Sequence, residues 1–503
     1  MGTYPIHITH AWHGYLWVPV VFTSPIPSFR PGDSQYERSV ATANLLYRFS
    51  KPDFVVQPKS PLHVQTIIKT AVPRGLKITI KNGGHSFAGF STTNRGILVD
   101  LCHMQDVRLH DGPSGKPESV TLGGGIGQLN GGRCPTVGVS GLVLGVGLGP
   151  FTRKLGMGCD ALTEATIVTA DGELVTVKES DDKQLEKGKL FWALRGAGGG
   201  NFGVVVELKM KVQRVEDGVL DGPFIDTMKK LYLFDWPPEA TIDTHWVCDV
   251  KPNKASSVRF DGKKGKFDKL IDRAIGEAHP QLADRMKERT CSEPSTLFLH
   301  ETLVAQWWEE TTRAFPSNKS YSLYTSFVFE KRPGIVEIVA DKAILEVTWI
   351  HAGGNASKPK SDQTAFPWRD GTYSTYIMLQ WEEKWLAGKI KRFLEAFKAE
   401  LKPFSMERRA AYVNFADVGL RDCGSVYYGD KYPKLQEVKQ IWDRRDYFHP
   451  PQGVRLPGNE NNGEDSVDWM DLAEWQWEHR PVGFPTPKDD FAGTIRDLTD
   501  LRF

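Results

Sequence analysis

The chain has 503 residues, of which 40% are hydrophobic and 25% charged, and its formal net charge is +1. This length exceeds what one compact core usually holds, and the composition is that of an ordinary globular protein, so we predict two packed domains. The balanced charge excludes a strongly basic surface for nucleic acid. The six cysteines include no CxxC pair, which argues against a structural zinc site or a disulfide scaffold, and no metal site is predicted.

No targeting or membrane-spanning segment is predicted. The apolar stretch at residues 15–22 contains Pro19 and has no lysine or arginine before it, and it is too short to cross a bilayer. We therefore expect no membrane contact, and the compartment stays open.

The first predicted unit lies within residues 53–101 and alternates strands with one helix. The dipeptide Ser60-Pro61 is typical of a helix N-cap followed by proline in the first turn. The helix has one apolar face, and two later strands flank a glycine turn, which together form a small α/β unit. The strands are residues 53–56, 76–80 and 96–101, and the apolar face is Val64, Ile67, Ile68 and Ala71.

A second predicted unit, residues 161–212, contains strands, a short helix and a glycine loop. The motif Gly198-x-Gly200-x-x-Gly203 formally matches the dinucleotide fingerprint. However, a predicted helix precedes it and a predicted strand follows, which is the reverse of the order that a Rossmann fold needs. We therefore reject a Rossmann interpretation.

The later residues divide into three regions. Residues 216–409 mix tryptophans and charged helical stretches with strands at 321–330 and 343–350, which indicates an α+β domain. Residues 410–454 resemble neither a new domain nor a tail. Residues 455–503 are rich in Asp, Glu, Pro and Gly without periodicity, so we expect an irregular tail.

The loop Asn82-Gly83-Gly84-His85-Ser86 is a candidate phosphate cradle. It follows a predicted strand, and glycine lets consecutive backbone N–H groups converge on an anion. A plain tight turn is the alternative, and a histidine in a loop is more often merely solvated. The residues by themselves leave both interpretations open.

Five motifs follow one another along the chain: "IKNGGHSFAGF", "GGRCPTVGVSGLVLGVGLG", "LFWALRGAGGGNFGVVVELKMKV", "YVNFADVGL" and "YYGDKYPKLQEVKQIWDRRDYFHPPQGV". In this order they resemble the FAD-linked oxidases of the berberine-bridge-enzyme type, within the vanillyl-alcohol-oxidase superfamily. The resemblance implies an α+β fold with a two-part PCMH-type FAD-binding domain, residues 31–215 and 410–454, around a substrate domain at 216–409. The segment from "HAGGN" to "TAFPWRDGTYSTYI" is most similar to fungal hydroxynicotine-oxidase-like members.

The resemblance also implies the cofactor contacts. FAD would be bonded covalently to His85, with a second, thioether bond to Cys134. The sequence departs from the family pattern in a shortened segment near residues 127–131, at Val146, which interrupts a glycine triplet, and at Lys431, which replaces a frequent asparagine. The other implied contacts are Asn82, Gly83, Gly84, Ser86, Val137, Gly138, Ser140, Gly141, Leu144, Gly145, Val204 and Tyr428.

Such an enzyme takes a hydride from a substrate carbon and needs a base for the accompanying proton. Tyr412 fits the family tyrosine beside the flavin, although its ordinary pKa near ~10 would need lowering by a nearby positive charge. Asn414 could hold a substrate or flavin oxygen, and Gln380 could orient the substrate. His351 is an alternative base. Each could instead be a packed structural residue, and for His351 that alternative is at least as strong.

The substrate is the least determined part of the prediction. Aromatic side chains in residues 216–409 can stack on sugars or on alkaloid-like rings, and the resemblance favours a small secondary metabolite over an oligosaccharide. A carbohydrate oxidase and a non-catalytic flavin-binding relative stay open as alternatives. The aromatic residues are Trp349, Trp368, Tyr373, Tyr376, Trp381 and Trp385.

The predicted electron acceptor is molecular oxygen. In the family, the residue two before the linking cysteine lies over the route by which oxygen reaches the ring. Here that residue is Gly132, which has no side chain to block it. We therefore expect a monomeric oxidase that releases hydrogen peroxide, and not a dehydrogenase.

Overall fold

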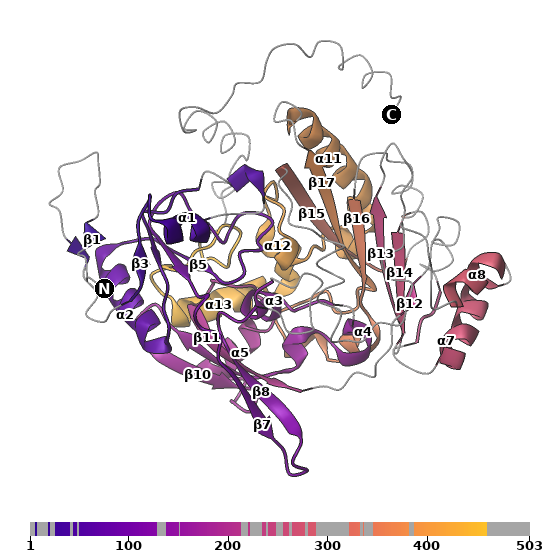
Figure 1. Ribbon diagram of the computed structural model, residues 1–503, viewed down its shortest axis with the longest axis horizontal. Coiled ribbons are helices and arrows are strands. Elements are labelled where there is room, and N and C mark those ends of the chain that lie inside the picture. The colour runs from indigo at the N-terminus through magenta and orange to yellow at the C-terminus, as the bar shows by residue number, and fades with distance from the viewer. Residues whose placement is uncertain are drawn as a thin grey trace.

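The protein is described by a computed structural model that covers most of residues 26–459. In Figure 1, the N-terminal β-structure and the yellow C-terminal helices lie to one side of a sheet built from residues 220–381. Within the described residues, no helix is both long and apolar enough to cross a membrane, and no group of His, Cys, Asp and Glu could hold a metal ion. The described residues are 6–7, 19–20, 26–40, 44–47, 50–127, 137–149, 151–212, 220–221, 234–237, 240–247, 255–260, 264–276, 280–287, 321–331, 335, 346–381 and 387–459.

A four-stranded sheet in the order β3-β4-β6-β5 forms the first unit. Strands β4 and β5 run parallel to β6, and helix α2 (Pro61–Ala71) connects β4 to β5. The predicted N-cap is confirmed, because the Ser60 side chain accepts a hydrogen bond from the His63 N–H, and the predicted apolar face of α2 is buried. The other elements are β3 (Ser28–Phe29), α1 (Ser34–Val40), η1 (Leu45–Tyr47), β4 (Phe54–Val56), η2 (Val72–Arg74), β5 (Ile78–Lys81) and β6 (Ile97–Asp100), with a separate pair β1 (Ile6–His7) and β2 (Pro19–Val20).

A five-stranded antiparallel sheet follows, in the order β10-β9-β11-β8-β7. The glycine loop at residues 196–203 runs from helix α5 into strand β11, so the order of elements that excludes a Rossmann fold is confirmed. The hairpin of β7 and β8 was not predicted, and every residue of β7 is exposed. The elements are β7 (Val107–Asp111), β8 (Pro117–Gly123), α3 (Val139–Leu144), α4 (Thr152–Leu155), η3 (Gly158–Asp160), β9 (Leu162–Val168), β10 (Leu174–Lys178), α5 (Glu186–Ala193) and β11 (Val204–Lys211).

The third sheet has six antiparallel strands in the order β12-β14-β13-β16-β17-β15. The strands predicted at 321–330 and 343–350 correspond to β15 and β16. The elements are β12 (Leu220–Asp221), β13 (Ala240–Val247), β14 (Ala255–Phe260), α7 (Lys264–Ile271), η4 (Asp272–Gly276), α8 (Pro280–Lys287), β15 (Tyr321–Phe329), β16 (Glu346–His351), η6 (Gly354–Ser357), η7 (Ser361–Gln363), β17 (Tyr373–Trp381) and α11 (Ala387–Leu401).

The C-terminal described segment returns to the five-stranded sheet. Leu435, Val438 and Val454 share one buried apolar cluster with Leu122 of β8 and Leu190 of α5. The expected α+β fold class is confirmed, whereas the exact domain boundaries stay a prediction. Most of the predicted irregular tail, residues 460–503, lies outside the described residues. The elements here are η9 (Lys402–Phe404), η10 (Met406–Arg408), η11 (Val413–Phe415), α12 (Cys423–Tyr428), η12 (Gly429–Lys431) and α13 (Tyr432–Trp442).

A largely buried carboxylate connects the segment before β9 to the segment before β17. Asp160 in η3 accepts from Arg369 at 2.6 Å and from Arg195 at 3.4 Å, and the Arg369 side chain is only 1% exposed. The guanidinium groups of Arg195 and Arg369 are largely shielded from water, and this one carboxylate supplies the negative charge that balances both.

Replacing Asp160 by asparagine should therefore destabilise the protein by about 3 kcal/mol, because it leaves two buried arginines without a counter-charge. The control is Asp171→Asn, which removes an exposed pairing with Arg445 at 3.8 Å and should cost less than about 1 kcal/mol. Chemical denaturation of both variants measures the difference, and equal midpoints would contradict the prediction.

Candidate functional site

The glycine turn after β5 is held by the side chain of Asn82. Its Nδ2 atom donates to the Gly124 carbonyl at 2.7 Å and to Ser140 Oγ at 2.8 Å. Ser140 Oγ donates in turn to the same Gly124 carbonyl at 3.0 Å. The turn is thereby fixed to the end of β8 and to helix α3, and the resemblance implies that the turn and α3 lie around a cofactor.

His85 lies half-buried in this turn, directly after Gly84, whose φ of +73° favours glycine. Burial lowers the pKa of the His85 imidazole, so the ring is neutral at pH 7. A neutral imidazole keeps the nitrogen lone pair that a covalent bond to a cofactor requires. Ser86 supports the turn, since its Oγ accepts from the Phe90 N–H at 3.0 Å, and Gly83 lies beside it, partly exposed.

Helix α3 is bounded by two glycines, and each lies against an asparagine. A Cβ atom added at Gly138 would lie 2.3 Å from Asn82 Cγ. One added at Gly145 would lie 1.9 Å from Asn414 Oδ1. At both ends of the helix, glycine is required because a side chain approaches too closely for any other residue.

Carbonyl groups of α3 accept hydrogen bonds from distant parts of the chain. The Leu144 carbonyl accepts from the backbone N–H groups of Gly196 at 3.0 Å and Gly198 at 2.9 Å. The Gly141 carbonyl accepts from Asn414 Nδ2 at 3.2 Å. Helix α3 thus holds both the glycine loop before β11 and the C-terminal segment that contains Asn414.

Tyr412 lies beside Asn414 and is only 1% exposed. Its phenol oxygen accepts from Asn414 Nδ2 at 3.2 Å. Burial raises the pKa of Tyr412, and this hydrogen bond opposes only part of that rise. The group that favours its charged form is therefore a neutral donor, whereas the sequence led us to expect a nearby cation.

Four half-buried aromatic rings gather between the glycine turn and the third sheet. Phe87, two residues after His85, stacks on Tyr324 of β15, with ring centroids 3.9 Å apart and an interplanar angle of 8°. Phe87 also stacks on Phe415 at 5.6 Å, and Tyr376 of β17 contacts Phe415 at 4.7 Å. Phe415 in turn contacts Tyr412 at 4.9 Å, so the predicted linking turn and the predicted base lie in one continuous cluster.

Sequence reasoning found Tyr376 in this cluster but missed Phe87, Tyr324 and Phe415. Phe87 and Phe415 stood in quoted motifs, yet their contact joins residues far apart in the chain and leaves no local signal. Most of the other predicted aromatics are structural, and Trp385 lies outside the described residues. The buried ones are Trp349, Trp368, Tyr373 and Trp381.

The geometry argues against His351 as a base. It is fully buried, and its Nε2 atom lies 3.0 Å from Arg153 Nη1, which makes it the acceptor of that hydrogen bond. Burial, then Arg153, lowers the pKa of His351 well below its ordinary value. Its ring also stacks on Tyr373 at 4.7 Å, which fits a packed residue. Gln380 lies in β17, paired with Ser322 of β15.

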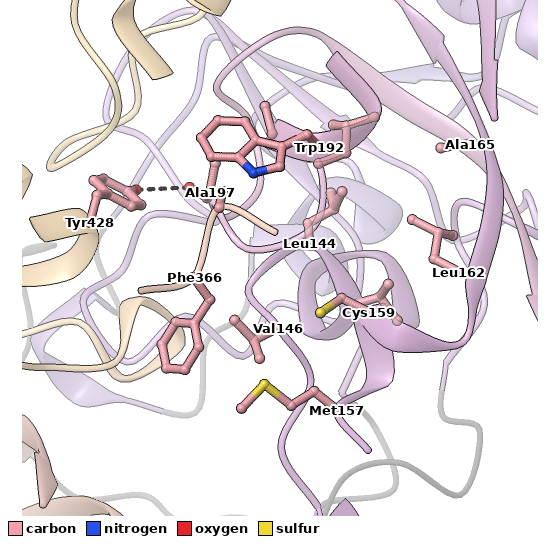
Figure 2. Close-up of a cluster of buried hydrophobic side chains, with 14 of the residues drawn as sticks. Leu144, Val146, Met157, Cys159, Leu162, Ala165, Trp192, Ala197, Phe366 and Tyr428 are labelled. Atoms are coloured by element: carbon pink, nitrogen blue, oxygen red, sulfur yellow. Dashed lines mark hydrogen bonds between the residues drawn. The ribbon is translucent and has the colours of Figure 1, made fainter. Parts of the chain in front are cut away.

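Two predicted cofactor contacts are buried in the protein interior. The Tyr428 hydroxyl donates to the Ala197 carbonyl at 2.8 Å, as the dashed line in Figure 2 shows, and so holds the glycine loop. Val204 is 1% exposed and packs in the apolar cluster that includes Val168. Direct cofactor contacts by either residue stay a prediction. Val137 is half-buried two residues before α3, and Cys134 lies outside the described residues.

Two known families match this chain. The family described as FAD binding domain matches residues 52–126 and 117–178, which include the glycine turn and part of α3. The family described as Berberine and berberine like matches residues 411–455, which include Tyr412 and Asn414. The chain is thus similar to the berberine-bridge-enzyme-like FAD-linked oxidoreductases in both its N-terminal and its C-terminal parts. Its closeness to the fungal hydroxynicotine-oxidase-like members stays a prediction.

Relatives of this berberine-bridge-enzyme-like protein match along most of their length. Tetrahydroberberine oxidase from Berberis wilsoniae is 26% identical over 465 residues, which cover 80% of this chain and 85% of the relative. BBE-like 1 of Physcomitrella patens shares the fold with a TM-score of 0.71 and 22% identity, over 86% of this chain and 97% of the other. Glucooligosaccharide oxidase of Acremonium strictum has a TM-score of 0.71 and 21% identity, and the match covers 86% of this chain and 96% of the other.

FAD is the cofactor of this family, and the described residues fit it. The turn at residues 82–87 is partly exposed throughout, with a glycine at positive φ and a neutral imidazole. Beside it, a Cβ added at Gly141 would meet no other atom within 4 Å, which leaves open space next to α3. The turn, α3 and the Tyr412 segment therefore line one region that could hold the flavin.

Proposed function

We propose that this oxidoreductase removes a hydride from an alcohol or amine carbon of a small aromatic secondary metabolite and passes the electrons to oxygen. FAD supplies the hydride acceptor, and we propose that it is bound covalently through His85 and also through Cys134. The observation that carries the proposal is the continuous ring cluster from Phe87, two residues after His85, through Phe415 to Tyr412. The cluster supports a site in which the proposed linking turn and a proton acceptor lie together.

In this proposal Tyr412 takes the substrate's O–H or N–H proton as the hydride leaves. Its oxygen already accepts a hydrogen bond from Asn414, which favours the deprotonated form. Loss of a hydride and a proton oxidises the substrate carbon by two electrons. Oxygen receives both electrons and both protons and becomes hydrogen peroxide.

The substrate class rests on the rings of Phe87, Tyr324, Tyr376 and Phe415. Flat rings stacked 3.9 Å apart suit another flat ring, because offset stacking is favourable between aromatic groups. Aromatic faces also bind sugars, and glucooligosaccharide oxidase has a similar fold, so oligosaccharides belong in the same substrate screen. The partners in this proposal are a small-molecule substrate and molecular oxygen.

Tyr324→Ala should raise the Michaelis constant for aromatic alcohols or amines by about tenfold, because the stacking face is lost. A screen of aromatic alcohols, aromatic amines and oligosaccharides with this variant measures the effect. Phe393→Ala, which removes a half-buried ring stacked on Phe397 in α11, is the matched control. Preferred turnover of oligosaccharides, unaffected by Tyr324→Ala, would favour the carbohydrate oxidase.

Holoenzyme precipitated with acid should keep its yellow colour, because covalently bound flavin survives unfolding. His85→Ala should leave one flavin–peptide bond, at Cys134, and slow turnover. Mass spectrometry of the digested protein measures both links, with His110→Ala, an exposed histidine in β7, as control. Release of all flavin from the unaltered protein by acid would exclude covalent attachment.

Air should reoxidise the substrate-reduced enzyme and yield one hydrogen peroxide for each substrate oxidised. Gly132→Leu should slow this reoxidation by about tenfold or more while leaving anaerobic reduction nearly unchanged, because the added side chain would block oxygen. Stopped-flow mixing with air-saturated buffer measures the rate. Negligible reoxidation of the unaltered enzyme would instead indicate a dehydrogenase.

A further inference from the structure

We infer that Tyr324, in the third sheet, holds His85 in position for covalent attachment of the flavin, and that it does so by stacking on Phe87. The inference rests on the proposed covalent link at His85. For this step Tyr324 is a positioning residue, because it acts through Phe87 and the turn and not on the flavin itself. Attachment of the cofactor then depends on the docking of the predicted substrate domain, residues 216–409, against the turn.

The turn that carries His85 is anchored at its start by hydrogen bonds. The Asn82 side chain donates to the Gly124 carbonyl at 2.7 Å and to Ser140 Oγ at 2.8 Å. Two glycines separate Asn82 from His85, and Gly84 has φ +73°. Glycine restricts the backbone less than any other residue, so the anchor at Asn82 does not by itself fix His85.

The end of the turn is held by stacked rings. The ring of Phe87 lies 3.9 Å from that of Tyr324 with an interplanar angle of 8°, and 5.6 Å from that of Phe415 with an angle of 15°. Stacked aromatic pairs stabilise a contact beyond the effect of the area they bury. Because only Ser86 separates Phe87 from His85, a fixed Phe87 ring limits where the His85 imidazole can lie.

The alternation of side chains along a strand presents Tyr324 to the turn. Ser326, two positions after Tyr324 in β15, pairs with Tyr376 of β17, so Tyr324 and Tyr376 lie on one face of the third sheet. Ile377, the neighbour of Tyr376, is buried in the apolar cluster on the opposite face. The Tyr376 ring also lies 5.8 Å from that of Phe87. The register of the third sheet therefore sets where its rings meet the turn.

A second contact between this segment and the third sheet lies at Gly89. Its φ is +74°, and a Cβ atom added there would lie 2.6 Å from Tyr47 Cε1, so the ring of Tyr47 leaves room for glycine only. Tyr47, in η1, is buried in the same apolar cluster as Phe327 and Trp349 of the third sheet. The residues that follow Phe87 therefore rest on the core of that sheet as well.

The covalent step requires the His85 imidazole to stay within reach of the flavin's ring methyl group. One carbon–hydrogen bond of that methyl group and the imidazole N–H bond break, and a carbon–nitrogen bond forms. The two electrons and two protons released reduce one oxygen molecule, the proposed acceptor, to hydrogen peroxide. The rate of such a step depends steeply on how well the two reacting groups are held together. The stack of Phe87 on Tyr324 limits the freedom of His85 and so favours attachment.

The rate of flavin attachment tests the inference on the full chain. Riboflavin is returned to riboflavin-starved cells, and mass spectrometry of the digested protein follows the gain of flavin by the His85 peptide. Tyr324→Ala and Phe87→Ala should each slow this gain by about two- to tenfold, the factor that corresponds to one aromatic pair. The double variant should be no slower than either single variant, because both remove the same contact. Tyr324→Phe keeps the ring and should attach flavin at the wild-type rate.

Matched variants separate the stack from general damage to the fold. Phe393→Ala removes a half-buried ring that stacks on Phe397 in α11, and it should leave the rate of attachment unchanged. Gly89→Ala places a Cβ atom against Tyr47 and should slow attachment. Gly115→Ala, at a similar φ of +68° but with no other atom within 4 Å of the added Cβ, should not.

Amide hydrogen exchange measures the effect of the stack without any flavin link. The N–H groups of Gly89 and Phe90 donate to the Ser86 carbonyl at 3.1 Å and to Ser86 Oγ at 3.0 Å. In a His85→Ala background, which cannot form the link, Tyr324→Ala should speed the exchange of both amides by about two- to tenfold. Tyr324→Phe in the same background should leave their exchange unchanged.

Attachment at the wild-type rate in Tyr324→Ala and Phe87→Ala would overturn the inference and leave the proposed covalent link intact. Unchanged hydrogen exchange in Tyr324→Ala would likewise overturn it, because the stack would then not hold the turn. Absence of flavin from His85 in the wild-type protein would instead refute the proposed link itself. Slower attachment in Tyr324→Ala that the Tyr324→Phe variant does not share supports both.

Discussion

The backbone of helix α3 is the constraint on which the rest of the site depends. With only six residues, it cannot satisfy its own terminal carbonyls, and such groups must find partners elsewhere. The Leu144 carbonyl takes two N–H groups from the glycine loop before β11, and the Gly141 and Leu142 carbonyls take the Asn414 amide. Segments more than fifty and more than two hundred residues away are thereby brought to one helix end.

The positions at the two ends of the same helix have no room for a Cβ atom. Gly138 lies against Asn82 and Gly145 against Asn414, both closer than a Cβ atom permits. Each asparagine also donates hydrogen bonds to neighbouring carbonyls, so the pairs combine close packing with polar satisfaction. An irregular region of backbone is made rigid in this way without regular secondary structure, and rigidity is what a site needs to hold a cofactor and a base in register.

Local features of the fold were predictable from the sequence, and long-range contacts were not. Ser60-Pro61 and the apolar spacing after it predicted α2 because a cap and a 3.6-residue period are local signals. The turn at His85 and the identity of Tyr412 came from motif resemblance. Phe87 and Tyr324, which stack on each other, are 237 positions apart in the chain (324 − 87). No periodicity or motif spacing in the sequence predicts such a contact. Val146 was recognised as a departure, but its positive φ follows from the surrounding packing.

Tyr412 and Tyr428 illustrate how one residue type serves opposite purposes in a dry interior. Burial penalises the phenolate at both positions, so an uncompensated tyrosine would stay protonated throughout the ordinary pH range. At Tyr428 the Ala197 carbonyl accepts a hydrogen bond from the hydroxyl, which favours the neutral phenol further, and this hydrogen bond holds the glycine loop in place. At Tyr412 the Asn414 amide donates to the phenol oxygen instead, which opposes part of the effect of burial. A cation would lower the pKa more, but it would also attract solvent and counter-ions into a site that has to exclude them. A neutral donor that is already fixed avoids that cost, and it remains in place while the proton moves.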